Sequence, residues 1–121
     1  MVVFGENDTG DIPWYRPQFK LVQDTPFGFR SVEELKASAS CAPNRWPSDA
    51  ALFLINHWVD TPPANKPTNA AKVNTYDALL ARARRCEDAR QRLPNLLAVD
   101  FYESGDLLRV VDTLNGFVSG P

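Results

Sequence analysis

The sequence predicts an α/β fold built on a largely parallel sheet, and three observations support this. Short runs of apolar β-forming residues alternate along the chain with segments of helical spacing, which is the order that a parallel sheet requires. The run 52–58 begins with four consecutive apolar residues, as expected of a strand buried on both faces. Every predicted strand also ends in polar residues, at the place where parallel α/β folds gather functional groups.

Two strands are predicted in the first part of the chain. The runs 2–5 and 19–23 are rich in β-forming residues and are bounded by turn-forming residues. Between them, two prolines bracket Trp14 and Tyr15. This pattern predicts a loop with aromatic anchors.

A helix, a strand and a loop are predicted in the middle of the chain. Ser31 and Glu34 have the spacing of a capping box, so a short helix should run to about Ser38. The apolar run 52–58 is the clearest strand. Residues 60–68 contain three prolines, which predicts a rigid, extended loop.

A long helix, a strand and a last helix are predicted in the remainder. The long helix should begin near Asn74 and end before Pro94, and its apolar residues recur at helical spacing. They are Val73, Tyr76, Leu79, Leu80, Ala83 and Cys86. A strand is expected at 96–101, and a helix should follow from 104 until Asn115 and Gly116 stop it.

Composition places the chain among ordinary globular proteins. Its 121 residues are 44% hydrophobic and 23% charged, so a single domain spanning 1–121 is expected. A net charge of −2 gives no strong attraction to nucleic acid. No apolar stretch approaches the roughly 20 residues of a membrane span. The start has neither a basic lead nor a cleavage site, so no signal peptide is predicted, and the chain is expected to open in the middle of a fold.

Five arginines cluster near the end of the long helix, interrupted by two acidic residues. They are Arg82, Arg84, Arg85, Arg90 and Arg92. Such a mixed run predicts the solvated face of a helix.

The two cysteines, Cys41 and Cys86, leave two interpretations open. They either form a disulfide or stay as buried free thiols in a reducing compartment. A bridge would connect the loop after the first helix to the long helix.

Polar residues end each of the four predicted strands and suggest a site at one edge of the sheet. They are Glu6 and Asn7; Gln23, Asp24 and Thr25; Asn56, His57 and Trp58; and Asp100, Tyr102 and Glu103. Carboxyl ends of parallel strands meet at one edge, so these side chains should surround a common site. The alternative is that strand ends are simply where the chain meets water.

His57 and Asp100 are the two candidates for acid–base chemistry. His57, the single histidine, either orients a phosphate or transfers protons, or it is a satisfied structural residue. Asp100 ends a buried strand, where a carboxylate needs a partner. It either polarises a histidine or arginine, or bonds the backbone of the next loop. No metal-ligand spacing or glycine-rich phosphate loop is present, so no cofactor is expected, and a dependence on calcium stays open.

Several motifs, taken in order, resemble the second half of phosphatidylinositol-specific phospholipase C X-domain-like phosphodiesterases. The motifs are 2–7, 13–15, 41–45, 52–59 and 94–102, and the resemblance extends over most of the chain. It implies the C-terminal half of a TIM-type (β/α)8 barrel, with about four parallel strands and helices on the outside. It also implies a phosphoric diester hydrolase that cleaves phosphatidylinositol or a related phosphodiester by general acid–base catalysis. In this chemistry the inositol 2-hydroxyl attacks phosphorus, two histidines transfer protons and an arginine steadies the phosphate.

The resemblance also implies roles for individual residues. Asp100 matches the late-strand carboxylate that supports a catalytic histidine, and Glu6, Asn56, His57 and Tyr102 match substrate-binding positions at the rim. Both histidines of the family lie in the half of the barrel that this sequence does not contain. The chain alone should therefore be inactive or nearly so.

The resemblance bears on partners and location as well. Relatives are usually exported, which suggests an extracellular protein whose disulfide joins Cys41 and Cys86. A half-barrel has open sheet edges, so the chain should pair either with a missing N-terminal half or with a second copy of itself. Two alternatives to the enzyme remain: a non-catalytic module that binds phosphoinositide or sugar, and an oligomerising half-barrel.

Overall fold

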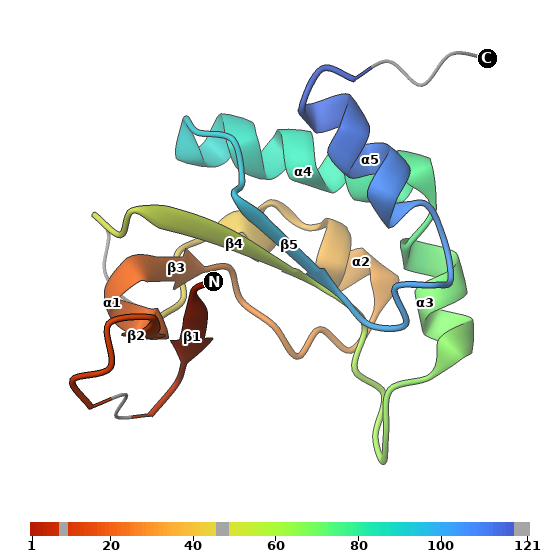
Figure 1. The fold of residues 1–121 in the computed structure, drawn as a ribbon. Coiled ribbons are helices and arrows are strands. Elements are labelled where there is room, and N and C mark those ends of the chain that lie inside the picture. Colours follow the sequence, from red (N-terminus) through yellow and green to blue (C-terminus); the bar gives the residue numbers. More distant parts are fainter. Residues whose placement is uncertain (8–9, 46–48, 118–121) are drawn as a thin grey trace.

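The computed structural model describes residues 1–7, 10–45 and 49–117, which form a mixed α/β structure with two small parallel sheets (Figure 1). Strands β1 (Val3–Gly5) and β2 (Tyr15–Pro17) form the first sheet. Strands β3 (Val22–Asp24), β4 (Leu52–His57) and β5 (Leu96–Val99) form the second, in that order. The predicted parallel α/β class is therefore confirmed.

The helices lie between and after the strands. They are α1 (Gln18–Leu21), α2 (Val32–Lys36), the 3₁₀ turn η1 (Ser38–Cys41), α3 (Pro67–Val73), α4 (Tyr76–Arg90) and α5 (Leu107–Leu114). Among the helices of the described ranges, none has the length and apolarity that crossing a bilayer requires.

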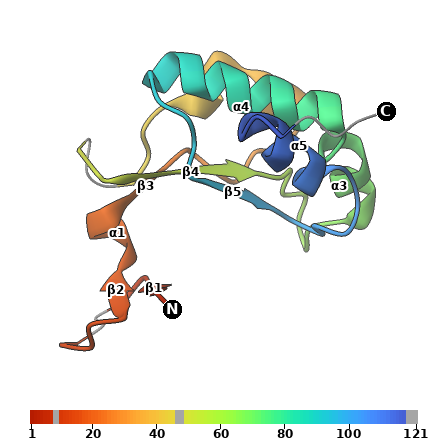
Figure 2. The same cartoon turned by 45° about the horizontal axis from the view of Figure 1, so that its top comes forward.

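The larger sheet has two different faces (Figure 2). Helices α4 and α5 cover one face, while α1 and the β1–β2 sheet lie toward the other. Alternation along β4 sends Phe53 and Ile55 toward the helices, where they form the core with Ala83 and Cys86 of α4. We call this the helix-covered face.

The opposite face, here called the open face, carries the alternate residues of the same strands. In the strand register Leu54 pairs with Leu96 and with Asp24, so these three side chains share that face. Leu96 is 38% exposed and Leu54 is half-buried, although apolar strand residues normally lie under cover.

Cys41 of η1 and Cys86 of α4 form a disulfide with a sequence separation of 45 residues. Both residues are buried in the core between the helices and β4. Of the two interpretations left open by the sequence, the disulfide is the confirmed one.

Two helix starts show how local sequence directs the fold. The hydroxyl of Ser31 accepts from the backbone N–H of Glu34 at 3.1 Å, as the capping box predicts. Helix α4 begins at Tyr76, two residues after Asn74, near which it was expected to begin. Its first N–H donates to the carboxylate of Asp106 at 3.0 Å, so a residue 30 positions away caps it.

Three element predictions are corrected by the structure. Residues 15–17, expected to be loop, form β2, because they pair in parallel with β1. The expected strand 19–23 is instead the short helix α1 followed by β3. The proline-rich segment 60–68 ends in a helix, because Pro67 stands at the first position of α3, where a missing N–H costs nothing.

The arginine cluster is also corrected. The cluster was expected to be a solvated face, but Arg82 is only 2% exposed and points from α4 toward β4. Its neighbour Arg84 is exposed and pairs with Glu87 at 2.7 Å. The charged run therefore has one side in solvent and one side in the protein.

Candidate functional site

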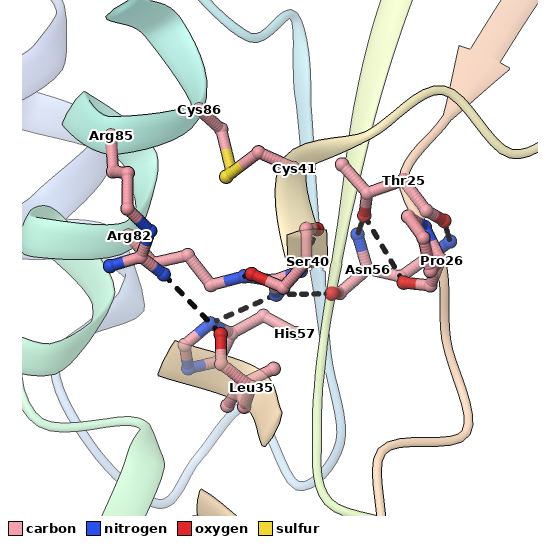
Figure 3. Close-up of a disulfide and its surroundings, with 10 residues drawn as sticks. All are labelled: Thr25, Pro26, Leu35, Ser40, Cys41, Asn56, His57, Arg82, Arg85 and Cys86. Carbon is pink, nitrogen blue, oxygen red and sulfur yellow. Dashed lines mark hydrogen bonds between the residues drawn. A yellow bond between two sulfur atoms is a disulfide. The ribbon is translucent and has the colours of Figure 1, made fainter. Parts of the chain in front are cut away.

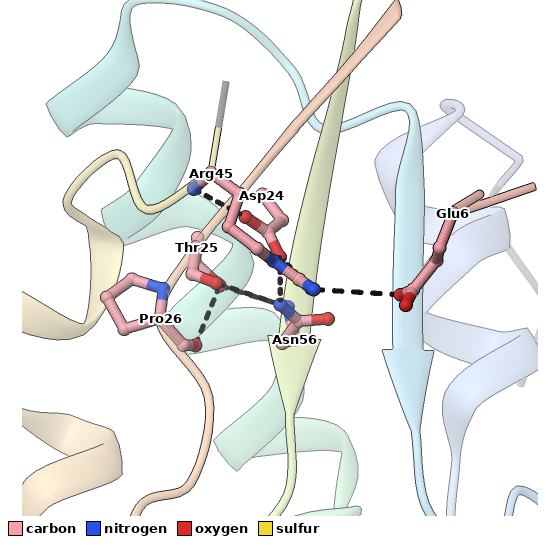
Figure 4. A network of polar contacts seen from close by, with 6 residues as sticks. All are labelled: Glu6, Asp24, Thr25, Pro26, Arg45 and Asn56. Carbon is pink, nitrogen blue, oxygen red and sulfur yellow. Dashed lines mark hydrogen bonds and ion pairs between the residues drawn. The ribbon is translucent and has the colours of Figure 1, made fainter. Parts of the chain in front are cut away.

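The open face carries a buried ion pair between Asp24 and Arg45 (Figure 4). Asp24, the last residue of β3, is 0% exposed. Its Oδ2 accepts from Nε and Nη2 of Arg45 at 2.9 and 2.5 Å, and its Oδ1 accepts from the Arg45 backbone N–H at 2.9 Å. Three charge-assisted bonds hold this arginine to the end of one strand.

Asn56 links the same carboxylate to the next strand. Its Nδ2 donates to Oδ2 of Asp24 at 3.1 Å and to the carbonyl of Thr25 at 2.8 Å. Its backbone N–H donates to the hydroxyl of Thr25 at 3.0 Å. The polar ends of β3 and β4 are therefore connected by direct hydrogen bonds, and Asp24 is satisfied from two sides.

Two aromatic rings and Glu6 complete the surroundings of Arg45. The guanidinium lies 4.5 Å from the Phe19 ring centroid and 4.6 Å from that of Phe27. Its Nη1 is 3.6 Å from Oε1 of Glu6, which follows β1. Side-chain exposures of 32% for Arg45 and 61% for Glu6 place this end of the network at the surface.

The geometry leaves Arg45 able to bind an anion. Nε and Nη2 are used on Asp24, whereas Nη1 makes only the 3.6 Å contact with Glu6 among the described residues. A planar guanidinium fixed on one edge and open on another is suited to bind phosphate oxygens. Glu6 would then be the competing anion at this site.

Asp100 and Tyr102 lie beyond the end of β5, in a separate group. The Asp100 carboxylate accepts a short hydrogen bond from Asn65 of the β4–α3 loop, and its carbonyl accepts from Asn74 at 2.8 Å. Burial, with a smaller contribution from the charge of Asp60, raises the pKa of Asp100. Tyr102 is 64% exposed and its hydroxyl donates to Glu103.

His57 points to the helix-covered face, because it follows Asn56 directly in β4. It is 1% exposed, and its Nε2 lies 2.9 Å from the carbonyl of Val73. The structure thus connects Glu6 to Arg45 and Asn56 to Asp24 in one network. Asp100, Tyr102 and His57 make their hydrogen bonds outside this network. That any of the five predicted site residues contacts a substrate stays a prediction.

Arg45 is the residue of this network that sequence reasoning did not single out. It lies in the motif 41–45, which contributes to the family resemblance. The available signal was Asp24, because a carboxylate that ends a buried strand requires a cationic partner. Within the described ranges, no three His, Cys, Asp or Glu side chains gather closely enough to hold a metal ion.

Comparison with known proteins identifies the family. The model of the PI-PLC X family matches residues 1–115. The chain belongs to the PI-PLC X family. It is similar to PI-PLC X domain-containing protein 1 of Arthroderma benhamiae, with 24% identity over 125 residues. That alignment covers 96% of this chain but 41% of the relative, so the chain spans about two-fifths of the relative's length. No solved structure matches the chain significantly.

Proposed function

We propose that this PI-PLC X chain contributes the C-terminal half of a phosphoric diester hydrolase of the phosphatidylinositol phospholipase C type. The observation that carries the proposal is Arg45, which Asp24 and two aromatic rings hold at the strand ends of the open face. In the complete barrel this guanidinium would bind the phosphate and stabilise the charge that develops on it during attack by the inositol hydroxyl.

The arrangement of layers supports a half-barrel of the TIM type. Helices α4 and α5 lie on one face of a parallel sheet, as in the outer ring of such a barrel (Figure 2). The open face bears the polar strand ends and half-exposed apolar residues such as Leu54, which a second half would cover. The coverage of 41% of the relative's length agrees with a chain that supplies part of a barrel.

The roles of the remaining residues follow from this assignment. Asp100 would support a histidine supplied by the other half, because its carboxylate can accept a hydrogen bond from an imidazole N–H as it does from Asn65. Glu6 and Asn56 would contact the inositol hydroxyls beside Arg45, with Tyr102 further along the rim. The disulfide agrees with an oxidising, extracellular location.

The test is a calorimetric titration of the purified chain with myo-inositol 1-phosphate. We expect saturable binding, which Arg45→Gln weakens by about tenfold or more because a charge-assisted contact is lost. Arg30→Gln is the matched control, since it removes the same charge from an exposed arginine that pairs only weakly with Asp60 at 3.9 Å. Thermal melts establish that each variant is folded at the assay temperature.

Equal affinity of Arg45→Gln and the parent chain would refute the phosphate-binding role. A separate assay follows release of inositol phosphate from phosphatidylinositol vesicles. The chain alone should release none, and turnover by the isolated chain would show that the missing half is not needed for catalysis.

A further inference from the structure

A pocket lies on the helix-covered face, between α2 and α4 and beside the end of β4. Its volume is about 170 Å³. Most of its wall is apolar and includes Val32, Leu35 and Val73. The remaining wall is basic, with Arg82 and Arg85 of α4, Lys36 of α2, and His57. The pocket is therefore an apolar cavity with cationic groups at its edge.

Arg82 brings a positive charge into this pocket without an anion to balance it. Its guanidinium donates to the carbonyl of Asn56, to the carbonyl of Ser40 at 2.9 Å and to the Ser40 hydroxyl at 3.3 Å. Within the described residues, no carboxylate lies within 4.0 Å of it. Burial and the neighbouring Arg85 lower its pKa to about 9, so it keeps its charge at neutral pH.

Arg85 adds a second cation with an unused donor. Its Nη2 donates to the carbonyl of Leu35 at 3.3 Å, while its Nε is buried and has no hydrogen-bond partner among the described residues. Figure 3 shows Arg82 and Arg85 reaching from α4 toward His57 and Leu35. A buried donor without a partner is costly, so this position favours a ligand that accepts.

His57 also lines this pocket, and its imidazole ring is neutral. A carbonyl only accepts, so the contact with Val73 at 2.9 Å places the proton on Nε2 and leaves Nδ1 facing Arg82 at 3.4 Å. The ring therefore adds no negative charge, and the two arginines stay uncompensated.

We propose that this pocket is a binding site for a small organic carboxylate. The carboxylate would accept from Arg85 Nε and from the Arg82 guanidinium, and its apolar body would lie against Leu35, Val32 and Val73. An apolar cavity of roughly 150 Å³ holds a benzene ring, so the pocket fits an aromatic ring or a short aliphatic chain. The site lies on the face opposite Arg45 and does not depend on the proposed phosphodiesterase function.

The probe is benzoate, and the readout is the NMR signal of the imidazole of His57, which is the only histidine in the chain. At constant ionic strength, benzoate should move this signal saturably with a dissociation constant below about 1 mM. Benzyl alcohol has the same ring without the charge, and inorganic phosphate has charge without the ring. Both should bind at least about tenfold more weakly.

The matched variants are Arg85→Gln and Arg84→Gln, on adjacent positions of α4. Arg85→Gln should weaken benzoate about tenfold, whereas Arg84→Gln should leave it unchanged, because Arg84 is exposed and pairs with Glu87. The proposal is overturned if benzoate does not saturate, if benzyl alcohol or phosphate binds as tightly, or if the two variants behave alike. If a variant does not fold, the titrations of the parent chain with benzoate, benzyl alcohol and phosphate still test the proposal.

Discussion

Asp24 is completely buried, and its charge depends on Arg45 for compensation. Removing one partner of a buried pair costs about 3–5 kcal/mol when it leaves an uncompensated charge. We expect Arg45→Gln to lower the free energy of unfolding by about 3 kcal/mol for this reason. Asp24→Asn should cost less, since the arginine left behind reaches solvent.

Urea denaturation of both variants at pH 7 measures the difference. Arg30→Gln is again the control, and it should change stability by less than about 0.5 kcal/mol, as surface pairs do. A larger loss of unfolding free energy for Asp24→Asn than for Arg45→Gln would contradict the assignment of Asp24 as the buried partner of this ion pair.

His57 links stability to pH. Burial lowers its pKa from 6.5 to about 4 in the folded chain, and the charges of Arg82 and Arg85 add to this effect. The unfolded chain therefore takes up a proton between pH 6.5 and about 4 that the folded chain does not, so stability falls as pH falls through this window. From these two values the loss integrates to about 3 kcal/mol.

Denaturation curves at pH 7 and pH 4.5 test this, with His57→Gln as the comparison. The variant should lose much less stability on acidification than the parent. Asp100 titrates with the opposite sign, because its pKa is raised, and it is present in both proteins. Equal pH slopes in the two proteins would show that His57 is not the group responsible.

At the scale of elements, one glycine fixes how α5 approaches α4. Gly105 has φ +124°, and a Cβ on it would overlap the backbone of Asn74, the residue that precedes α4's N-cap and bonds the Asp100 carbonyl. We expect Gly105→Ala to lower the free energy of unfolding by about 2 kcal/mol or more. Gly116→Ala, at φ +78° with open space around it, should cost only about 1 kcal/mol.

Thermal unfolding of the two variants separates two effects. Both variants have an unfavourable positive φ, but only Gly105→Ala also overlaps Asn74. Similar losses would show that the contact with Asn74 yields easily, and that α4 and α5 are not held together at this point.

The disulfide joins η1 to α4 and should stabilise the folded chain by more than the packing contacts of the two cysteines alone. On the chain-entropy model, a loop of 45 residues corresponds to about 4 kcal/mol. Cys41→Ala with Cys86→Ala should therefore lower the urea midpoint strongly, and added reductant should have no further effect on that variant. A parent chain that is equally stable with and without reductant would contradict this expectation.

Elements with strong local signals could be predicted from sequence, and those that depend on distant contacts could not. β4 follows from four apolar residues in a row, and α2 from the Ser31 capping box. β2 has no such signal, because it exists only through its pairing with β1. The start of α4 lies within two residues of the predicted one, but its capping side chain could not be predicted, since it comes from Asp106.

The site shows the same division. Polar strand ends could be predicted to gather, and Glu6 and Asn56 do join one network, through Arg45 and Asp24 respectively. The face that each strand residue occupies could be predicted from the two-residue period of a strand, which places His57 and Asn56 on opposite faces. The partner of Asp24 was not available, because it comes from a loop 21 positions away.

At the scale of the whole molecule, the open face predicts association. Leu96 is 38% exposed on a face that a barrel would bury, and β5 is an edge of its sheet. We expect light scattering to show a dimer of the purified chain. Leu96→Asp should produce a monomer, because it places a charge in the contact, whereas Leu108→Asp on α5, where the leucine is already 74% exposed, should not.

A parent chain that stays monomeric, melts cooperatively and does not bind an apolar dye would contradict this. In that case the open face would be stable in water without a second half.

The segment 40–45 serves both faces of the sheet at once. Ser40 bonds Arg82 on the helix-covered side, Cys41 is bonded to α4, and Arg45 reaches Asp24 on the open side. The single Cys41–Cys86 disulfide therefore anchors the six-residue segment that contacts Arg82 of one proposed site and supplies Arg45 of the other. In a reduced chain this segment would lose its covalent anchor to α4, so we expect both proposed sites to bind anions more weakly before the two thiols are oxidised.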